Sequence, residues 1–141
     1  MEAVAAASAI AGLVSLALEV TAIIHQYTSS VENAPQHVLE LVEEVTALSH
    51  VLNTLEIFVR EEDMKGKGFE QTSVLCSSLH GCRSRMETLK LRLQKIHGSK
   101  QLLRVIKLLK WPLGETETMA AIEALHRYAE IFHMSLDIDG W

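Results

Sequence analysis

The opening segment constrains this chain most, because it is a long apolar run that carries almost no charge. Between Ala3 and Ile24 the only formal charge is Glu19, and small or aliphatic residues dominate the rest. As an α-helix at about 1.5 Å per residue, the run would span roughly 33 Å, close to the ~30 Å hydrocarbon core of a bilayer. It is only weakly apolar, because alanines and residues such as Ser8 and Gly12 dilute it. The segment therefore suits both a membrane and the interior of a soluble bundle.

Three interpretations of this segment compete. An export signal begins with a basic region, whereas this chain opens with Met1-Glu2 and has no Lys or Arg before Arg60. A permanent membrane anchor conflicts with Glu19, whose charge costs about 2.5–3.5 kcal/mol near a bilayer centre. We therefore expect the segment to be the buried first helix of a bundle at rest, which leaves its later release into a membrane open.

Length and composition predict a single all-α domain covering residues 1–141. The chain is 48% hydrophobic and 22% charged, which is typical of a globular protein with a substantial core. Two prolines, three phenylalanines and the lack of alternating β-branched runs argue against a sheet. We expect a helical bundle of four long helices plus one short helix. The expected helices cover residues 1–29, 34–62, 70–97, 100–111 (the short one) and 115–136.

Apolar residues at spacings of three and four mark the expected buried face of each later helix. In 34–62 they are Val38, Leu41, Val45, Leu48, Leu52, Leu55 and Val59. In 70–97 they are Leu75, Leu79, Cys82, Met86, Leu89, Leu93 and Ile96, and we expect this row to face the previous one. In 115–136 they are Met119, Ile122, Leu125, Ala129, Phe132 and Leu136.

Charge is distributed unevenly along the chain. Residues 83–110 hold nine basic residues against Glu87 alone, a balance of +8, while the rest of the chain sums to −13 and the total is −5. Basic and apolar residues alternate at helical spacing in 100–111, a pattern that suits anionic lipid surfaces. The alternative is a solvated face paired with acidic helices of the same bundle. Nucleic-acid binding is disfavoured, because no known recognition-helix motif accompanies these basic residues. The predicted lipid-docking residues are Arg92, Lys95, Lys100, Arg104, Lys107 and Lys110.

The sequence offers little support for catalysis. It contains no phosphate-binding glycine loop, no dinucleotide-binding fingerprint, no zinc-protease motif and no nucleophile elbow. Cys76, His80 and Cys82 lack a fourth metal ligand, and the two cysteines are expected to be reduced thiols in a cytosolic core. We therefore expect no enzyme activity, no cofactor and no metal site.

Several segments in order resemble a known family. The opening Ala-Ser-Ala-Ile-Ala-Gly-Leu-Val-Ser-Leu, the stretch Val31-Glu32-Asn33-Ala34-Pro35 and the Leu41 to Leu55 row are similar to the HeLo-like N-terminal domain of fungal STAND (NOD-like receptor) proteins. Leu109-Lys110-Trp111-Pro112-Leu113 resembles the late Lys-Trp-Pro segment of that family. The resemblance covers essentially the whole chain.

The resemblance implies a cell-death effector domain of innate immunity or heterokaryon incompatibility. Such a domain is cytoplasmic at rest, and on oligomerisation it inserts its first helix into the plasma membrane. Its partners would be anionic lipids, further copies of itself and a downstream nucleotide-binding domain. The open alternative is a non-lytic adaptor that acts through homotypic or partner-helix contacts. Carried onto this chain, the inserting residues would be Val4, Ala7, Ser8, Ile10, Ala11, Gly12, Leu13, Ser15, Leu16 and Glu19.

Overall fold

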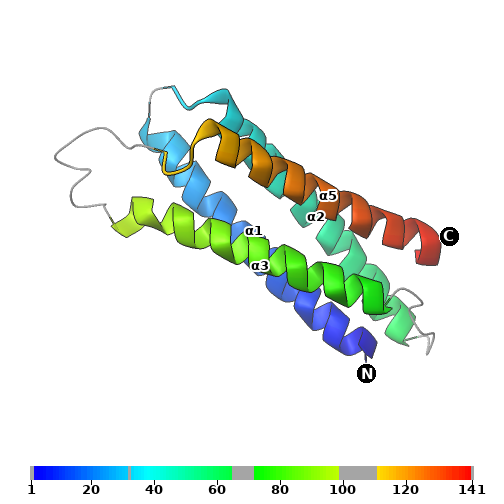
Figure 1. Ribbon diagram of the computed structural model, residues 1–141. Helices are drawn as coiled ribbons and strands as arrows, with labels where there is room; N and C mark the ends of the chain where they lie inside the picture. The colour runs from blue at the N-terminus through cyan, green and yellow to red at the C-terminus, as the bar shows by residue number, and fades with distance from the viewer. Residues whose placement is uncertain (1, 32, 65–71, 99–110, 141) are drawn as a thin grey trace.

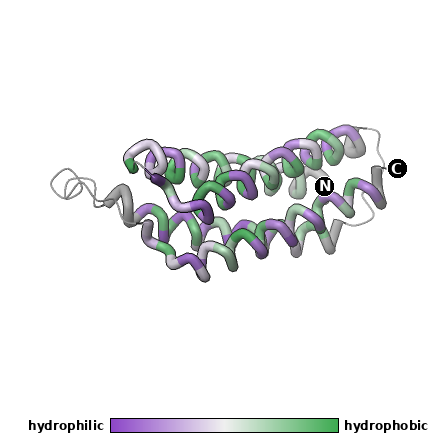
Figure 2. Tube along the Cα trace, turned by 90° about the horizontal axis from the view of Figure 1, so that it is seen from above, coloured by the Kyte–Doolittle hydropathy of each residue, from purple (hydrophilic) through white to green (hydrophobic). Residues whose placement is uncertain are grey.

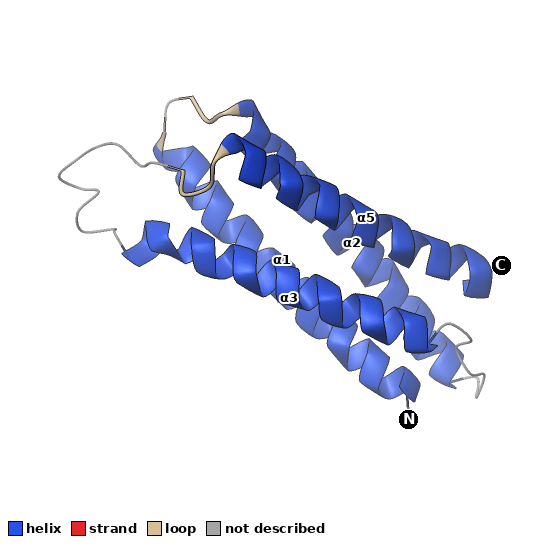
Figure 3. Cartoon of the chain, in the orientation of Figure 1, coloured by secondary structure: helices blue, strands red, loops and turns tan. Residues whose placement is uncertain are grey.

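The protein is an all-α bundle, as the composition predicts. The computed structural model describes residues 2–31, 33–64, 72–98 and 111–140. These ranges contain four long α-helices and no strand, and short connections appear in tan in Figure 3. The predicted short helix 100–111 lies outside the described residues except for Trp111. The helices are α1 (Glu2–Ser30), α2 (Gln36–Met64), α3 (Thr72–Gly98) and α5 (Glu115–Gly140).

The helices are arranged so that α1 packs against both α2 and α3. Helix α5 closes the other side, with a long contact to α2 and a shorter one to α3. Helices α1 and α3 run in one direction and α2 and α5 in the other (Figure 1). The described parts of α2 and α3 lie diagonally across the bundle, without the close backbone approach that each makes to α1. Both apolar rows, which the sequence predicts to face each other, belong to the same hydrophobic core. Periodicity identifies the buried face of a helix but not the helix beside it, so the diagonal placement could not be predicted.

The predicted apolar rows of α2 and α3 lie in the core, together with residues of α1 and α5. All seven predicted residues of α2 are fully buried, as are the predicted residues of α3 up to Leu93. The side chain of Ile96 lies outside the described ones. Figure 2 shows apolar and polar residues alternating along the helices, as a bundle with one buried face per helix requires.

The buried face of α5 departs from the prediction at its start. Leu125 and Phe132 are buried as expected, but Met119 is 37% exposed. Its place in the core is taken by the neighbouring Thr118, followed by Ala121. Small side chains allow α5 to come close to the helices it packs against. The buried Thr118 hydroxyl is hydrogen-bonded, because it donates to the Gly114 carbonyl at 2.9 Å.

Helix ends and cysteines bring further corrections. Helix α5 continues to Gly140, four residues past the predicted end, because no proline or glycine stops it after Leu136. Of the two cysteines predicted in the core, Cys82 is buried and Cys76 is exposed. The six-residue separation turns Cys76 away from the face that Cys82 occupies.

Candidate functional site

Helix α1 divides the predicted inserting residues between two faces. Ala7, Ile10, Leu13 and Leu16 are buried in the bundle core. Ser8, Ser15 and Glu19 are exposed, Ala11 and Gly12 are partly covered, and the side chain of Val4 lies outside the described ones. The predicted set therefore includes both the core contacts of α1 and its solvent face.

The described solvent face of α1 carries little charge and one large apolar side chain. Leu18 is 60% exposed, and small residues such as Ser15 and Ala22 surround it on the same face. Within the described helices, the segment Ala6–Ser30 alone is long and apolar enough to cross a membrane, and 44% of its most apolar window is buried. Core helices of soluble proteins have similar length and composition, but they are mostly buried. Here partly covered residues such as Ala9 and Val14 also pack against the core, and Leu18 is the large apolar side chain of this segment that is mostly exposed.

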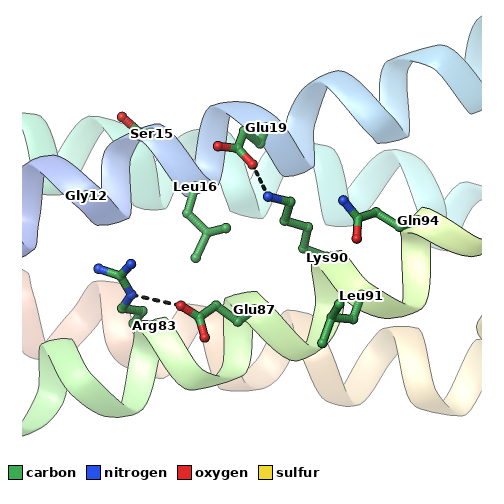
Figure 4. Close-up of a pocket in the computed structure, with 9 residues that line it drawn as sticks. All are labelled: Gly12, Ser15, Leu16, Glu19, Arg83, Glu87, Lys90, Leu91 and Gln94. Carbon is green, nitrogen blue, oxygen red and sulfur yellow. Dashed lines mark hydrogen bonds and ion pairs between the residues drawn. The ribbon is translucent and has the colours of Figure 1, made fainter. Parts of the chain in front are cut away.

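A groove of about 480 Å³ lies along the junction of α1 and α3 (Figure 4). In this groove the guanidinium group of Arg83 lies close to the backbone of Gly12. A Cβ atom added at Gly12 would lie 3.1 Å from an Nη atom of Arg83. Leu91 on the α3 side is 67% exposed. The lining residues are Gly12, Ser15, Leu16, Glu19, Arg83, Glu87, Lys90, Leu91 and Gln94.

The charges along this groove form two ion pairs. Lys90 of α3 donates to the Glu19 carboxylate of α1, and Arg83 Nε donates to Glu87 Oε1 at 2.9 Å within α3 (Figure 4). The four charges cancel, so the groove is neutral overall. Sequence reasoning missed the Glu19–Lys90 pair, because a contact between residues 71 apart depends on the register of two helices.

The predicted lipid-docking residues are only partly placed. Arg92 donates from Nη2 to Oε1 of Glu117 on α5 at 3.0 Å. Its positive charge is therefore already paired with an acid of the same bundle. Arg85, another base of α3, is exposed. The side chains of Lys95, Lys100, Arg104, Lys107 and Lys110 lie outside the described ones.

The end of α1 is held by the segment that leads into α5. The rings of Tyr27 and Trp111 lie 5.0 Å apart, and burial raises the pKa of Tyr27. Trp111 Nε1 donates to Thr118 Oγ1 at 3.0 Å. This network ties the last turn of α1 to the first turn of α5, so any movement of α1 out of the bundle must break it.

Helices α2 and α5 carry a polar contact of their own. Nδ1 of His126 lies 3.0 Å from Glu44, and Nε2 of the same ring lies 3.0 Å from Glu130. Across the described residues, no group of three or more His, Cys, Asp or Glu side chains is arranged to hold a metal ion. Glu44 is thus paired between α2 and α5.

The comparisons with known proteins identify the family. The family model described as "Pigment biosynthesis cluster protein PigL N-terminal" matches residues 1–120, and the chain belongs to that family. Neither the curated proteins nor the solved structures contain a match to this chain.

Proposed function

We propose that this domain is a non-enzymatic, membrane-targeting effector whose α1 leaves the bundle and inserts into a lipid bilayer. The observation that carries the proposal is the character of α1, an apolar segment from Ala6 to Ser30 that is long enough to span a membrane and is less than half buried. The resemblance to HeLo-like domains supplies the biological setting. In that setting the domain is cytoplasmic at rest, and it reaches the plasma membrane as an oligomer during programmed cell death.

Favourable and unfavourable contributions oppose each other in such a transfer. A bilayer can receive the side chains that α1 buries in the core, such as Ile10, Leu13 and Val20, without exposing them to water. A helix also brings no unpaired backbone groups into lipid. The opposing contribution is Glu19, next to the midpoint of the apolar segment, where a charge costs about 2.5–3.5 kcal/mol. Insertion therefore needs a trigger, such as oligomerisation.

The basic segment offers a means of reaching an anionic surface. We propose that Lys95, Lys100, Arg104, Lys107 and Lys110 attract anionic headgroups, with about 1 kcal/mol for each base close to the surface. Arg92 contributes less, because Glu117 holds its guanidinium group. A downstream nucleotide-binding domain would supply the trigger.

A second candidate function is a non-lytic adaptor that binds another helical surface. The groove between α1 and α3, with Leu91 exposed on one wall, favours this alternative. The two functions differ in one requirement, because only the membrane function needs α1 to leave the bundle.

Dye release from liposomes separates the two functions. We expect the protein to release dye from liposomes that contain anionic lipid and to release less from neutral ones. Leu18→Glu places a charge on the exposed face of α1, where it leaves the core intact but opposes insertion. Leu39→Glu on α2 is the matched control, because that leucine is also exposed. Leu13→Glu is unsuitable, because Leu13 is buried and the charge would unfold the bundle.

The expected result is release by the wild type and by Leu39→Glu, and loss of release by Leu18→Glu at unchanged helicity. Two results would reject the membrane function and favour the adaptor. One is dye release by Leu18→Glu equal to that of the wild type, and the other is no dye release by a folded and oligomeric wild type.

A further inference from the structure

We propose that Trp111 couples membrane docking to the release of α1, because its indole ring can bind either the end of α1 or the headgroup region of an anionic bilayer. In the resting bundle Trp111 contacts Tyr27 in the last turn of α1. On a membrane surface it would leave that contact and lie among the headgroups. This inference rests on the proposed function, since it names the residue that would connect lipid docking with insertion.

The resting contact joins the end of α1 to the start of α5 through one side chain. The indole ring lies 5.0 Å from the Tyr27 ring, tilted by 55°, and residues 111–114 pass beside the end of α1 (Figure 1). On its other side the ring donates from Nε1 to the buried Thr118 hydroxyl at 3.0 Å. The backbones of the described parts of α1 and α5 do not approach each other closely. Side chains such as these therefore make the link between the two helices.

Trp111 can reach a membrane because it is only partly buried. Tyr27 is 4% exposed, whereas Trp111 is a partly buried residue that packs against the core. Tryptophan is enriched at membrane interfaces, because its ring is apolar and its N–H needs a polar partner. A headgroup oxygen can accept the hydrogen bond that Thr118 accepts in the bundle. The bundle and the interface therefore offer the same two interactions to this side chain.

The position of Trp111 in the sequence places it where docking would begin. Lys110, one of the bases proposed to attract anionic headgroups, directly precedes it. Consecutive Cα atoms are about 3.8 Å apart, so a headgroup bound at Lys110 would bring the indole ring within reach of the interface. Transfer of the ring would remove a contact that holds the last turn of α1. Docking would thus lower the free energy needed to release α1.

The first test asks, without lipid, whether Trp111 holds α1. Hydrogen exchange measured by mass spectrometry compares the wild type with Trp111→Leu and Tyr128→Leu. Tyr128→Leu is the matched control, because it removes a ring pair with Phe132 inside α5. We expect exchange in the second half of α1 to rise about fivefold or more in Trp111→Leu and to stay at the wild-type level in Tyr128→Leu.

A milder variant guards against a fold that Trp111→Leu disrupts. Trp111→Phe keeps a ring beside Tyr27 but loses the hydrogen bond to Thr118, so it should give a smaller rise in the exchange of α1. No rise in α1 for either variant of Trp111 would overturn the proposal. An equal rise in α1 and in the second half of α5 would also overturn it, because that pattern indicates a general loss of stability.

The second test asks whether the membrane competes with Tyr27 for the indole ring. Trp141→Phe leaves Trp111 as the one tryptophan, and spin labels on lipid headgroups quench its fluorescence when the ring reaches the surface. Phosphatidylcholine liposomes that contain phosphatidylserine should quench it, and those without should not. Tyr27→Leu removes the resting contact. Half-maximal quenching should therefore need about fivefold less liposome in Tyr27→Leu than in Tyr128→Leu.

Equal quenching curves for the two tyrosine variants, or no quenching with phosphatidylserine, would overturn the coupling. Neither test measures dye release, so the two proposals can fail separately. Quenching of Trp111 without dye release would reject the insertion of α1 alone. Dye release without quenching of Trp111 would reject the coupling alone.

Discussion

Glu19 of α1 and Lys90 of α3 form an ion pair across the groove between the two helices. Among the described side chains of α1, Glu19 is the only Asp, Glu, Lys or Arg. The one charge that opposes membrane insertion is thus held by a neighbouring helix at the protein surface. Under the proposed function, release of α1 would separate this pair and leave Glu19 to be neutralised or carried into the bilayer.

Removing this charge should favour insertion. We expect Glu19→Gln to increase dye release from anionic liposomes, because the amide is much less costly than a carboxylate within a bilayer. Its effect on the free energy of unfolding should stay below about 1 kcal/mol, since the pair is largely exposed. Glu43→Gln on α2, which removes another exposed carboxylate, is the control and should leave release unchanged. Equal release by wild type and Glu19→Gln would show that Glu19 does not enter the bilayer.

The contact between α3 and α5 depends on a missing side chain. A Cβ atom at Gly81 would lie 2.6 Å from the hydroxyl oxygen of Tyr128 and 3.4 Å from its Cζ atom. Gly81→Ala should therefore destabilise the protein by about 1 kcal/mol net, because the clash outweighs the better helix propensity of alanine. In a Tyr128→Phe background the same change should stabilise by up to about 1 kcal/mol. Urea unfolding of the four proteins measures the difference, and an identical effect of Gly81→Ala in both backgrounds would contradict the contact.

The Thr118 hydroxyl links the two ends of the segment that joins Trp111 to α5. It accepts from Trp111 Nε1 and donates to the Gly114 carbonyl. Thr118→Val keeps the shape of the side chain and loses both bonds, so we expect a loss of about 1–3 kcal/mol in the free energy of unfolding. Thr118→Ser retains the hydroxyl and should lose less. If valine proves no worse than serine in thermal unfolding, the hydroxyl network does not stabilise the bundle.

The two cysteines should differ in reactivity. Burial raises the pKa of the Cys82 thiol from its ordinary value of 9.0 to about 12, whereas Cys76 is exposed. At pH 8 a thiol reagent should therefore label Cys76 in the native protein and both residues only after denaturation. Rapid native labelling of Cys82, located by mass spectrometry of peptides, would contradict its burial.

The raised pKa of Cys82 also makes stability depend on pH. Above its ordinary value of 9.0 the thiol ionises in the unfolded chain, but in the folded protein it stays protonated until about 12. Stability from this group is thus complete below pH 9 and is lost as pH rises toward 12, with about 1.4 kcal/mol gone one unit above the unfolded pKa. Urea unfolding between pH 8 and 11 should show a shallower decline in Cys82→Ala than in Cys76→Ala.

Helix type and the buried rows of α2 and α3 follow from local sequence, whereas the end of α5 did not. A row such as Leu41 to Leu55 has one apolar side, and any bundle must bury it. The neighbours of each helix do not follow, because α2 and α3 present equivalent rows whether they are adjacent or diagonal. The sequence also did not predict that Thr118 is buried and Met119 exposed. That choice depends on the hydrogen bond that Trp111 donates to the buried Thr118 hydroxyl.

The candidate site was predicted only in part. The apolar character of α1 is visible in the sequence, and so are the bases of residues 83–110. The groove and its Glu19–Lys90 pair could not be predicted from the sequence. Each joins residues of α1 and α3, so it depends on how these two helices are placed against each other. The same holds for Arg92, whose partner Glu117 lies on α5.

The depth of residue 18 in a bilayer tests the central claim most directly. Residue 18 is the midpoint of the apolar segment Ala6–Ser30, so a spanning α1 would place it at the bilayer centre. An environment-sensitive fluorophore on Leu18→Cys, in a Cys76→Ser background, can be quenched by bromines placed at different depths in anionic liposomes. We predict the strongest quenching from bromines at the bilayer centre. Fluorescence that is quenched only near the headgroups, or is unchanged by liposomes, would contradict insertion of α1.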